Sequence, residues 1–308
     1  MKFKVLGSGA GIPSRTRNTQ SFVLDVVEEI NQYFLIDASE ALQHRILNTT
    51  IRPSKIKHVF ITHLHGDHIF GLPGFLSSRA HQGGEGVPLV VYGPPGLKEW
   101  VEMTFKVSGS HLNYPIRFVE VSHNGEYDVE GFTVKSYLLD HAVDSFMYVF
   151  IEPDKLGALD SGKLKDIGIM PGPVYRDIKN SRTFQHDGET YDTADFLSPP
   201  VKGRKVAVHG DTRTIDRTDY LELLDGADLI VHEATYLEGE QEKAHQYFHS
   251  EINGVLNNLS GISYGRLLLG HISNRYDAEM IQSVEDRLGD RAILAHDYLE
   301  ITIPRDLR

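Results

Sequence analysis

The sequence predicts a layered α/β sandwich with helices on its outer faces. Short apolar runs rich in β-branched residues recur in both halves of the chain, and helical patterns lie between some of them. Strands mixed with helices in this way form sheets that the helices cover. The expected strands are KFKVLG, SFVLDV, QYFLID, HVFIT, LVVYG, IRFVEV, FTVKSYLL, MYVFIE, KVAVHG, DLIVHEAT, RLLLGHIS and AILAHDYLEITIP. The expected helices span roughly residues 39–48, 95–107, 219–225, 250–260 and 277–287.

Length and composition bound the class of protein. The chain has 308 residues and 40% hydrophobic residues, enough for one large domain spanning 1–308 and built of two similar halves. It has no cysteine, so a transition metal would be held by imidazole and carboxylate groups. The N-terminus lacks a signal peptide and no segment reaches membrane-spanning length, so we expect a cytoplasmic protein with no membrane partner. The net charge of −12 argues against broad nucleic-acid binding and requires any such contact to be local.

Residues 152–204 differ from the strand-rich halves on either side. The stretch is poor in strand pattern and contains the Gly-, Pro- and Asp-rich pieces GALDSGKL, MPGPVY, HDGET and SPPVKG. A connection of this length is more consistent with a functional insertion than with a simple loop. Between 155 and 182 it carries six basic and three acidic residues, a local excess of positive charge. We therefore expect an inserted arm suited to an anionic partner, with a solvated surface arm as the alternative.

The segment HVFITHLHGDHIFGLPG places four titratable groups directly after a buried strand. His63, His65, Asp67 and His68 follow the apolar run Val59–Ile61 within a few positions. His63 and His65 are two apart in extended chain and point the same way. The glycine between His65 and Asp67 lets the backbone turn, so that Asp67 and His68 face a neighbouring ion.

Three later strands also end in a residue of the metal-ligand type, namely His141, Asp211 and His271. Because strand ends in open sheets converge on one edge, seven such groups could meet there. We expect His63, His65 and His141 to hold one divalent ion, and Asp67, His68 and His271 to hold a second. Asp211 would bridge the two, since its carboxylate has two oxygens. A single histidine at a strand end is ordinarily a hydrogen-bonding residue, but the combined pattern argues against coincidence.

Two ions about 3.5–4 Å apart activate a water and stabilise both oxygens of an in-line displacement, which suits phosphodiester hydrolysis. Asp67 is then the candidate for orienting or deprotonating the water. The leaving alkoxide needs a proton donor, for which His249 is the candidate, with Glu233 as the carboxylate that orients it. From residue types alone, His249 could equally begin a helix and Glu233 could lie on the surface.

The motif THLHGDH at 62–68 resembles the HxHxDH signature of the metallo-β-lactamase superfamily, and the order His141, Asp211, His271 matches its later metal motifs. This resemblance implies an αββα sandwich. The absence of cysteine disfavours the β-lactamase branch that uses a thiolate ligand.

Within that superfamily the chain resembles the ribonuclease Z (tRNase Z) family, in its short bacterial form, over essentially its whole length. GSGAGIPSRTRN at 7–18 resembles the family's N-terminal PxKxRN loop, with Arg15 in place of the lysine. HEAT is intact at 232–235, whereas the HST motif reads HSE at 249–251. PGPVY at 171–175 matches the Gly-Pro element of the family's substrate-binding arm, and HISNRY at 271–276 matches its last metal motif.

The resemblance implies an endoribonuclease that removes the 3′ trailer from precursor tRNA and leaves a 3′-hydroxyl. It implies two Zn²⁺ per subunit, a homodimer, and an arm at 152–204 that acts as an exosite for precursor tRNA. Asp67 becomes the proton acceptor and His249 the acid. Arg15, Arg17, Asn18 and Arg275 become RNA contacts. The ligand types also accept other divalent metals, so zinc is not distinguished from manganese or iron.

Two other functions remain open at this point. A small-molecule metallo-hydrolase of the same superfamily (an arylsulfatase, lactonase or cyclic phosphodiesterase) would share every metal ligand but would not require the arm or the PSRTRN loop. A non-catalytic RNA-binding relative is disfavoured by the complete set of ligand-type residues.

Overall fold

The structure is a computed structural model that describes residues 1–305, and it divides the chain into two compact units. Unit 1 comprises residues 1–151 and 205–303. Unit 2 comprises residues 152–204 together with the described C-terminal residues 304 and 305. No helix among the described residues is long and apolar enough to cross a membrane.

Unit 1 contains two seven-stranded sheets. In spatial order the first consists of β18 (Glu300–Thr302), β1 (Lys2–Gly7), β3 (Ser21–Val26), β4 (Gln32–Ile36), β5 (Ile56–Phe60), β6 (Leu89–Gly93) and β7 (Ile116–Glu120). The second consists of β17 (Ile293–Leu294), β15 (Tyr264–Gly270), β14 (Ala227–Glu233), β13 (Lys205–Val208), β10 (Phe146–Ile151), β9 (Phe132–Leu138) and β8 (Gly125–Val129). Two short parallel strands, β2 (Gly9–Ala10) and β16 (Ile272–Ser273), pair separately.

The central core of unit 1 joins residues of both sheets. Phe34 and Phe60 of the first sheet pack against Phe150 of the second, with ring centroids 5.9 and 5.0 Å apart. All three side chains are fully buried. The inner faces of the two sheets therefore pack on each other, which buries the apolar strand runs that dominate the sequence.

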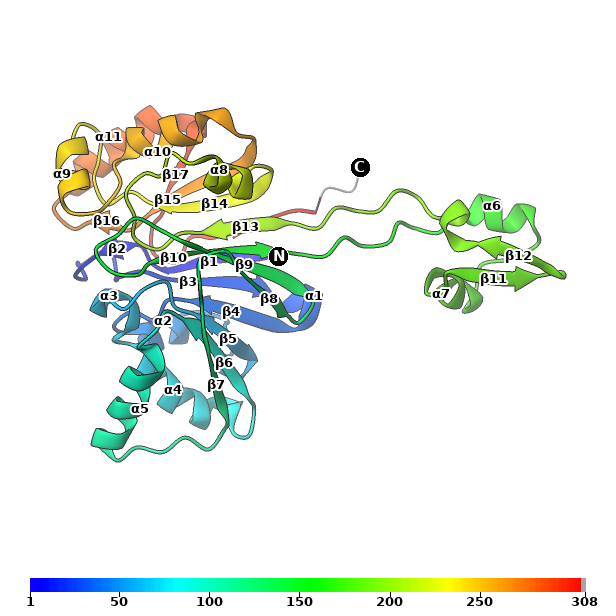
Figure 1. The fold of residues 1–308 in the computed structure, drawn as a ribbon, viewed down its shortest axis with the longest axis horizontal. Coiled ribbons are helices and arrows are strands. Elements are labelled where there is room, and N and C mark those ends of the chain that lie inside the picture. Colours follow the sequence, from blue (N-terminus) through cyan, green and yellow to red (C-terminus); the bar gives the residue numbers. More distant parts are fainter. Residues whose placement is uncertain (306–308) are drawn as a thin grey trace. The chain divides into compact units, whose positions relative to one another are not determined.

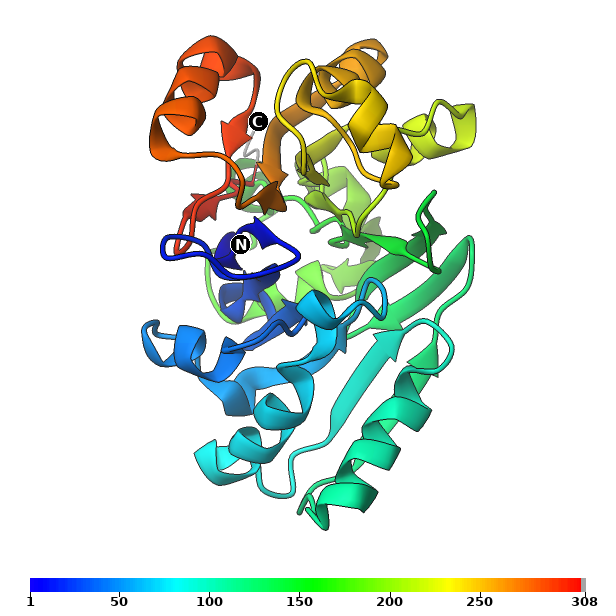
Figure 2. The ribbon, with the colours of Figure 1, turned by 90° about the vertical axis from the view of Figure 1, so that its left-hand side faces the viewer.

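Helices cover the outer face of each sheet (Figures 1 and 2). On the first sheet these are α2 (Leu42–Leu47), α4 (Leu72–Arg79) and α5 (Leu97–Ser108), which bury Leu42, Phe75 and Val101 in a second core. On the second sheet they are α8 (Thr218–Leu224), α10 (Ile252–Asn258) and α11 (Ala278–Leu288). The short helices α1 (Val27–Ile30), α3 (Gly66–Ile69) and α9 (Gln241–Gln246) lie in connections. The result is the αββα sandwich that the sequence predicts.

Some elements differ from the sequence-based expectation. The strand β8 was not expected, because its five residues are only half-buried at the edge of the sheet and lack a strong apolar run. The last apolar run divides into β17 and β18, which join different sheets. Helices α4 and α9 were also not expected. Each is short, and α4 lacks a distinct apolar face.

The direction of the strands determines where their C-terminal ends lie. In the second sheet β13, β14 and β15 are parallel neighbours. In the first sheet β4 and β5 are parallel neighbours. Residues that directly follow these strands therefore emerge side by side at one edge of each sheet.

Unit 2 is a small α/β unit with a core of its own. It contains α6 (Ser161–Asp166), α7 (Val174–Lys179) and a hairpin of β11 (Thr183–His186) and β12 (Glu189–Asp192). Leu164, Ile178 and Phe196 are buried in it. The sequence pattern missed the hairpin, because its strands are mostly exposed and polar.

Two antiparallel chain segments lead into and out of unit 2. Lys155 and Val201 exchange backbone hydrogen bonds of 2.9 Å. Any Cβ at Gly157 would lie 1.8 Å from the Ser198 carbonyl oxygen, so only glycine fits there. At the base of these segments Arg204 donates to the buried Glu152 carboxylate at 2.7 Å.

Candidate metal centre and active site

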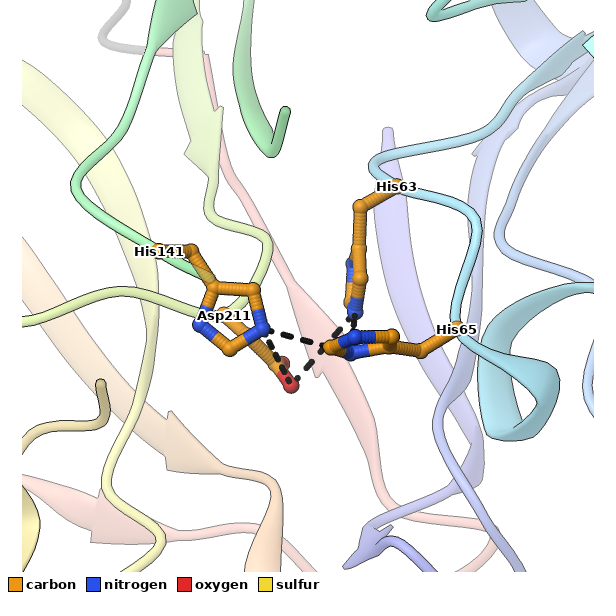
Figure 3. Close-up of side chains that lie close together, drawn as sticks. All are labelled: His63, His65, His141 and Asp211. Carbon is orange, nitrogen blue, oxygen red and sulfur yellow. Dashed lines mark hydrogen bonds and ion pairs between the residues drawn. The ribbon is translucent and has the colours of Figure 1, made fainter. Parts of the chain in front are cut away.

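Four of the predicted ligands lie together at one point (Figure 3). His63 Nε2 and His141 Nε2 lie 3.1 and 3.2 Å from His65 Nδ1. Asp211 Oδ2 lies 3.6 Å from His63 Nε2 and 4.0 Å from His141 Nε2. Four ligands at about 2.0–2.1 Å from one tetrahedral ion would be roughly 3.3 Å apart, so this cluster has the size of a metal site.

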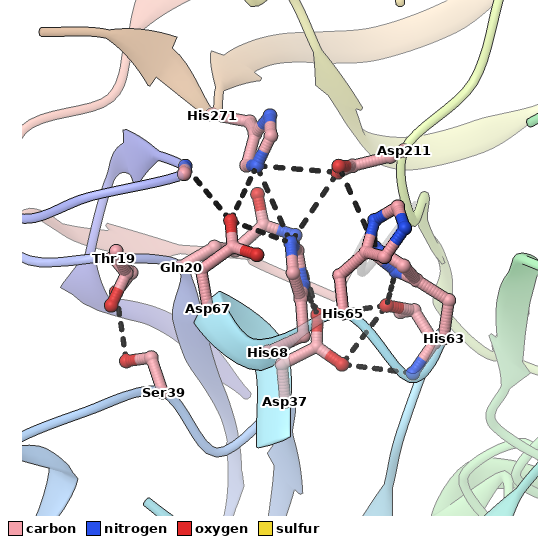
Figure 4. A network of polar contacts seen from close by, with 12 residues as sticks. Thr19, Gln20, Asp37, Ser39, His63, His65, Asp67, His68, Asp211 and His271 are labelled. Carbon is pink, nitrogen blue, oxygen red and sulfur yellow. Dashed lines mark hydrogen bonds and ion pairs between the residues drawn. The ribbon is translucent and has the colours of Figure 1, made fainter. Parts of the chain in front are cut away.

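The remaining three predicted ligands form an adjacent cluster (Figure 4). His68 Nε2 lies 3.3 Å from His271 Nε2, and Asp67 Oδ2 lies 3.4 and 3.3 Å from these two nitrogens. Asp211 Oδ1 completes the set at 3.5 Å from His68 and 3.4 Å from His271. The two oxygens of Asp211 thus face different clusters.

Hydrogen bonds determine which ring nitrogen of each histidine carries the proton. Nδ1 of His68 contacts an Asp37 oxygen at 2.8 Å, and Nδ1 of His141 contacts the Phe248 carbonyl at 2.8 Å. These oxygens only accept, so both Nδ1 atoms must donate. When the ring is neutral, as it must be to bind a metal, Nε2 is then an unprotonated acceptor directed into the site.

The same holds for His63 and His271 through two threonines. The Thr62 hydroxyl donates to Asp37 at 3.0 Å and therefore accepts from His63 Nδ1 at 3.1 Å. The Thr235 hydroxyl donates to Glu233 at 2.9 Å and therefore accepts from His271 Nδ1 at 2.8 Å. All four of these imidazoles consequently present a free Nε2 lone pair.

Lone pairs that face one another at these distances repel unless a cation lies between them. His68 Nε2 and His271 Nε2 cannot hydrogen-bond each other in this protonation state, although they are 3.3 Å apart. Asp211 Oδ1 is buried without a hydrogen-bond partner among the described residues. Buried unpaired acceptors of this kind are costly. The residues therefore fit a pair of divalent cations, for which imidazole and carboxylate are suitable ligands.

Asp37 is a site residue that the sequence analysis did not identify. It is fully buried directly after β4, and its two oxygens accept from His68 and from the backbone and hydroxyl of Thr62. It orients the candidate ligands His63 and His68 without facing the cluster itself. The signal was available, since Asp37 ends the expected strand QYFLID in the same way that Asp211 follows its own strand.

Gly210 explains how Asp211 reaches the first sheet. A Cβ at Gly210 would lie 2.5 Å from Ser145 Oγ and 2.7 Å from Thr62 Cβ. The backbone before Asp211 thus passes directly against the segment that carries His63. Only glycine permits this approach between the ends of β13 and β5.

Glu233 and His249 form a buried pair beside the clusters. His249 Nδ1 donates to Glu233 Oε1 at 3.0 Å. The fully buried Glu233 also accepts from the backbone of Thr212, Thr235 and Ser250. Burial lowers the pKa of His249, but the Glu233 carboxylate outweighs burial and raises it to about 9. Burial raises the pKa of Glu233, but the charge of His249 outweighs it and lowers it to about 2.

His249 also lies near Asp211 and His271, and these three groups could in principle hold an ion. Its Nδ1 lies 3.9 Å from Asp211 Oδ2. That nitrogen is already bonded to Glu233. The geometry therefore favours His249 as a proton donor over His249 as a ligand.

The N-terminal loop contacts the second cluster. The Gly11 N–H donates to Asp67 Oδ2 at 2.8 Å, and β2 pairs with β16 directly after His271. Asp67 is therefore a carboxylate that the loop helps to position.

The predicted RNA contacts differ in how free their side chains are. Arg15 is exposed. Arg17 donates to Ser8 Oγ at 2.7 Å and to the Ala295 carbonyl, and Asn18 donates to the Glu40 carbonyl at 2.7 Å. Arg275 pairs with Glu240 at 3.1 Å. Among these four, only Arg15 has a side chain with no hydrogen bond or ion pair to the rest of the described chain.

Glu251, which departs from the family's HST motif, has a structural role. Its carboxylate accepts from the Gly254 N–H at 2.9 Å, which caps the N-terminus of α10, and from the Gly239 N–H at 2.9 Å. A cap of this kind stabilises a helix start. The departure therefore keeps a capping group at this position.

The comparisons with known proteins agree with the fold. A family model described as anti-Pycsar protein Apyc1 matches residues 1–156. A curated ribonuclease Z from Staphylococcus carnosus is 44% identical over 284 residues, covering 92% of each chain. The crystal structure of human tRNase Z, short form, superposes with a TM-score of 0.70 at 25% identity, covering 99% of this chain and 100% of that one. The metallo-β-lactamase fold protein YhfI from Bacillus subtilis superposes with a TM-score of 0.65 at 14% identity, covering 97% and 98%.

The αββα sandwich with its His/Asp clusters defines a protein of the metallo-β-lactamase fold. Within that class the curated similarity extends over nearly the whole chain, including the Asp211, Glu233 and His271 region beyond residue 156. The chain belongs to the ribonuclease Z family.

Proposed function

We propose that this protein is an endoribonuclease that removes the 3′ trailer from precursor tRNA and leaves a 3′-hydroxyl. The observation that carries the proposal is the convergence of the two ligand clusters on the Glu233–His249 pair, in a chain that matches ribonuclease Z over 92% of its length. The phosphodiester would bind where the oxygens of Asp211 separate the two clusters.

His63, His65 and His141 would hold one ion, Asp67, His68 and His271 the other, and Asp211 would bridge them. We propose two Zn²⁺ per subunit, because imidazole and carboxylate ligands in clusters of this size suit zinc, although other divalent ions can use them. When bound, the ions supply an activated water and neutralise charge on the phosphoryl oxygens.

Asp67 would orient the attacking water. Its Oδ2 accepts from the Gly11 N–H, whereas its Oδ1 has no partner among the described residues. A free carboxylate oxygen at the edge of the clusters can accept a hydrogen bond from water and align it with the phosphorus.

His249 would protonate the leaving 3′ oxygen. Glu233 accepts from Nδ1, so Nε2 is the nitrogen left to deliver a proton. The five donors to Glu233 come from Thr212, Thr235 (two), His249 and Ser250, and they hold the carboxylate in place without solvent. Glu233 is thus a positioning residue and His249 the catalytic acid.

We propose that precursor tRNA binds through two regions. Unit 2 would act as the exosite arm, since most of its basic side chains are exposed. The N-terminal loop would contact the RNA end through Arg15, with Arg17 and Asn18 shaping the loop and Arg275 contributing after release from Glu240. A folded RNA recognised by backbone and shape needs only such local positive charge. The protein would work in the cytoplasm as a homodimer.

The alternative is a small-molecule metallo-hydrolase of the same superfamily, such as an arylsulfatase, lactonase or cyclic phosphodiesterase. A small substrate would use the same clusters and would have no use for unit 2. Dependence of the reaction on residues 152–204 therefore separates the two functions.

A 3′-extended precursor tRNA tests the proposal. We expect the protein to cut it next to the discriminator base, and we expect chelator to stop the reaction. Asp67→Ala should lose the cut, while Asp290→Ala, which removes an exposed carboxylate outside both clusters, should retain it. A cut that persists in chelator, or in Asp67→Ala, would refute this mechanism.

A further inference from the structure

A pocket of about 580 Å³ lies beside His249 in unit 1. Its walls come from the start of α9, the start of α10 and residues 213–214, and Asp140 stands next to the ligand His141. The volume falls in the range of roughly 300–1,000 Å³ that small-molecule sites occupy. The pocket shares His249 with the proposed active site, but no role has been given to its other walls.

Several wall groups are already engaged by the protein. Arg213 donates through Nε to the His245 carbonyl at 2.7 Å, and its guanidinium lies 3.8 Å from the centre of the Phe248 ring. Its Nη1 lies 3.6 Å from Asp140 Oδ2. Both oxygens of Glu251 accept backbone N–H groups. These contacts make a rigid wall.

Four polar side chains of the wall, those of Thr214, Gln241, Glu242 and His245, are exposed and have no hydrogen bond or ion pair within the described part of the chain. Glu242 is the carboxylate among them and lies on the first turn of α9. A phosphate here would meet the carboxylates of Asp140, Glu242 and Glu251. The walls therefore suit a neutral group with hydrogen-bond donors, such as the exocyclic amino group of a nucleobase.

The position of His249 decides which nucleoside reaches this pocket. In an in-line displacement the leaving oxygen lies opposite the attacking water. Because His249 would protonate the leaving 3′ oxygen, the nucleoside that carries this oxygen lies on the His249 side of the phosphorus. That is also the side of the pocket.

We propose that this pocket receives the last nucleoside retained on the tRNA, and that Glu242 accepts a hydrogen bond from the amino group of its base. The inference rests on the proposed function and extends it to the recognition of one base. Gly254 lines the pocket, and a Cβ there would meet only Thr214 Cγ2 at 3.4 Å and Glu251 Oε2 at 3.7 Å. A larger side chain at Gly254 would therefore enter the pocket without a backbone clash.

Single-turnover kcat/KM measured on four precursors tests the inference. Three of them differ at the last retained position, which carries adenosine, purine riboside (which lacks the amino group) or an abasic site. The fourth carries an abasic site at the first trailer position. For the wild type we expect about a tenfold loss when the retained base is absent, typical of one lost base contact. We expect a smaller loss with purine riboside, and the trailer change should have less effect than either.

Gly254→Leu should reduce kcat/KM on the adenosine precursor to the level that the wild type shows on the precursor with an abasic last retained position. The variant should show no further loss on that abasic precursor. Glu242→Ala should remove the preference for adenosine over purine riboside, because it removes the acceptor, whereas Glu222→Ala on α8 should keep it. Glu242→Ala changes an exposed residue, so it also carries the test if Gly254→Leu does not fold.

The failures are distinguishable. A wild type that cuts none of the precursors overturns the proposed function and this inference together. A wild type that cuts all four precursors equally, or that loses more at the trailer position, overturns this inference alone. Additive losses from Gly254→Leu and the abasic site would also overturn it.

Discussion

At the scale of single residues, the tautomers of the histidines are set by groups outside the ligand clusters. Asp37 and the Phe248 carbonyl accept directly from Nδ1 of His68 and His141. The hydroxyls of Thr62 and Thr235 each donate to a carboxylate, and they accept from Nδ1 of His63 and His271, respectively. Because each ring has one proton, these partners leave Nε2 free to bind a cation.

Asp37→Asn should weaken metal binding by about 10–100-fold, the usual effect of losing an orienting partner of a ligand. Asp37 accepts hydrogen bonds from His68 Nδ1 and from the Thr62 hydroxyl. An Asn side chain has one oxygen and one NH₂ group, so it would place a donor where one of these two bonds needs an acceptor. The measurement is the metal retained against a competing chelator. Asp290→Asn, which changes an exposed carboxylate, is the control, and equal retention in the two variants would show that Asp37 does not act through the ligands.

His249→Ala should lower kcat for precursor cleavage by about 10²–10⁴, the range expected for loss of a general acid. Its metal content should stay at the wild-type level, because Nδ1 is bonded to Glu233 and not left free as a ligand. Metal analysis and single-turnover kinetics measure the two effects, with the exposed His81→Ala as the control. Loss of metal in His249→Ala would instead make His249 a ligand.

At the scale of elements, the site depends on parallel strands. Asp211, Glu233 and His271 lie at or just after the ends of β13, β14 and β15, three parallel neighbours. Asp37 and His63 follow β4 and β5, which are also parallel neighbours. Groups that are up to about 230 residues apart in sequence thereby meet at the edge where these strands end. Ligand sites in α/β sheets generally lie at this edge.

Unit 2 can be removed with little disturbance to the sheet. Ile151 and Lys205 are directly opposed in the antiparallel pair of β10 and β13, so an Asn-Gly turn can replace residues 152–204. We expect this variant to lose precursor-tRNA cleavage and to keep hydrolysis of bis(p-nitrophenyl) phosphate. Both rates are measured on protein whose cooperative thermal unfolding shows that unit 1 is folded. Retained cleavage of precursor tRNA would contradict a substrate-binding role for the arm.

At the scale of the whole molecule, metal binding and stability should be coupled. Cations that bind only the folded state stabilise it by about 2.7 kcal/mol when the free metal is 100 times its dissociation constant. For a protein of this size we expect chelation to lower the melting temperature by roughly 5–10 °C. Asp211→Ala removes the shared ligand, and its melting temperature should respond little to chelator. An equal response in both proteins would place the effect outside the clusters.

The acidic character of the molecule also belongs to this scale. A net charge of −12 is unusual for a protein that binds RNA, and the positive charge proposed for tRNA contact is confined to unit 2, the N-terminal loop and Arg275. Local patches of this kind suffice because interactions beyond about one Debye length, about 8 Å at physiological salt, are largely screened.

The sequence by itself determined the sandwich, the ribonuclease Z resemblance and the choice of candidate ligands. Strand periodicity and the HxHxDH spacing are local features, and they can be identified without knowing which strands are neighbours. The expected helices at 95–107 and 277–287, for example, correspond to α5 and α11 within one residue or two. Sequence patterns were weaker for β8 and the hairpin of unit 2, whose strands bury little apolar surface.

Only the tertiary structure decided which groups serve the ligands and which contact the rest of the chain. Asp37 reaches His68 across 31 positions, and Arg17 and Asn18 turn inward to contact Ala295 and Glu40. The pocket beside His249 likewise joins Asp140 to residues 213–254. These are pairings between polar groups distant in sequence, and they exist because buried donors and acceptors must find partners once the two sheets have packed together.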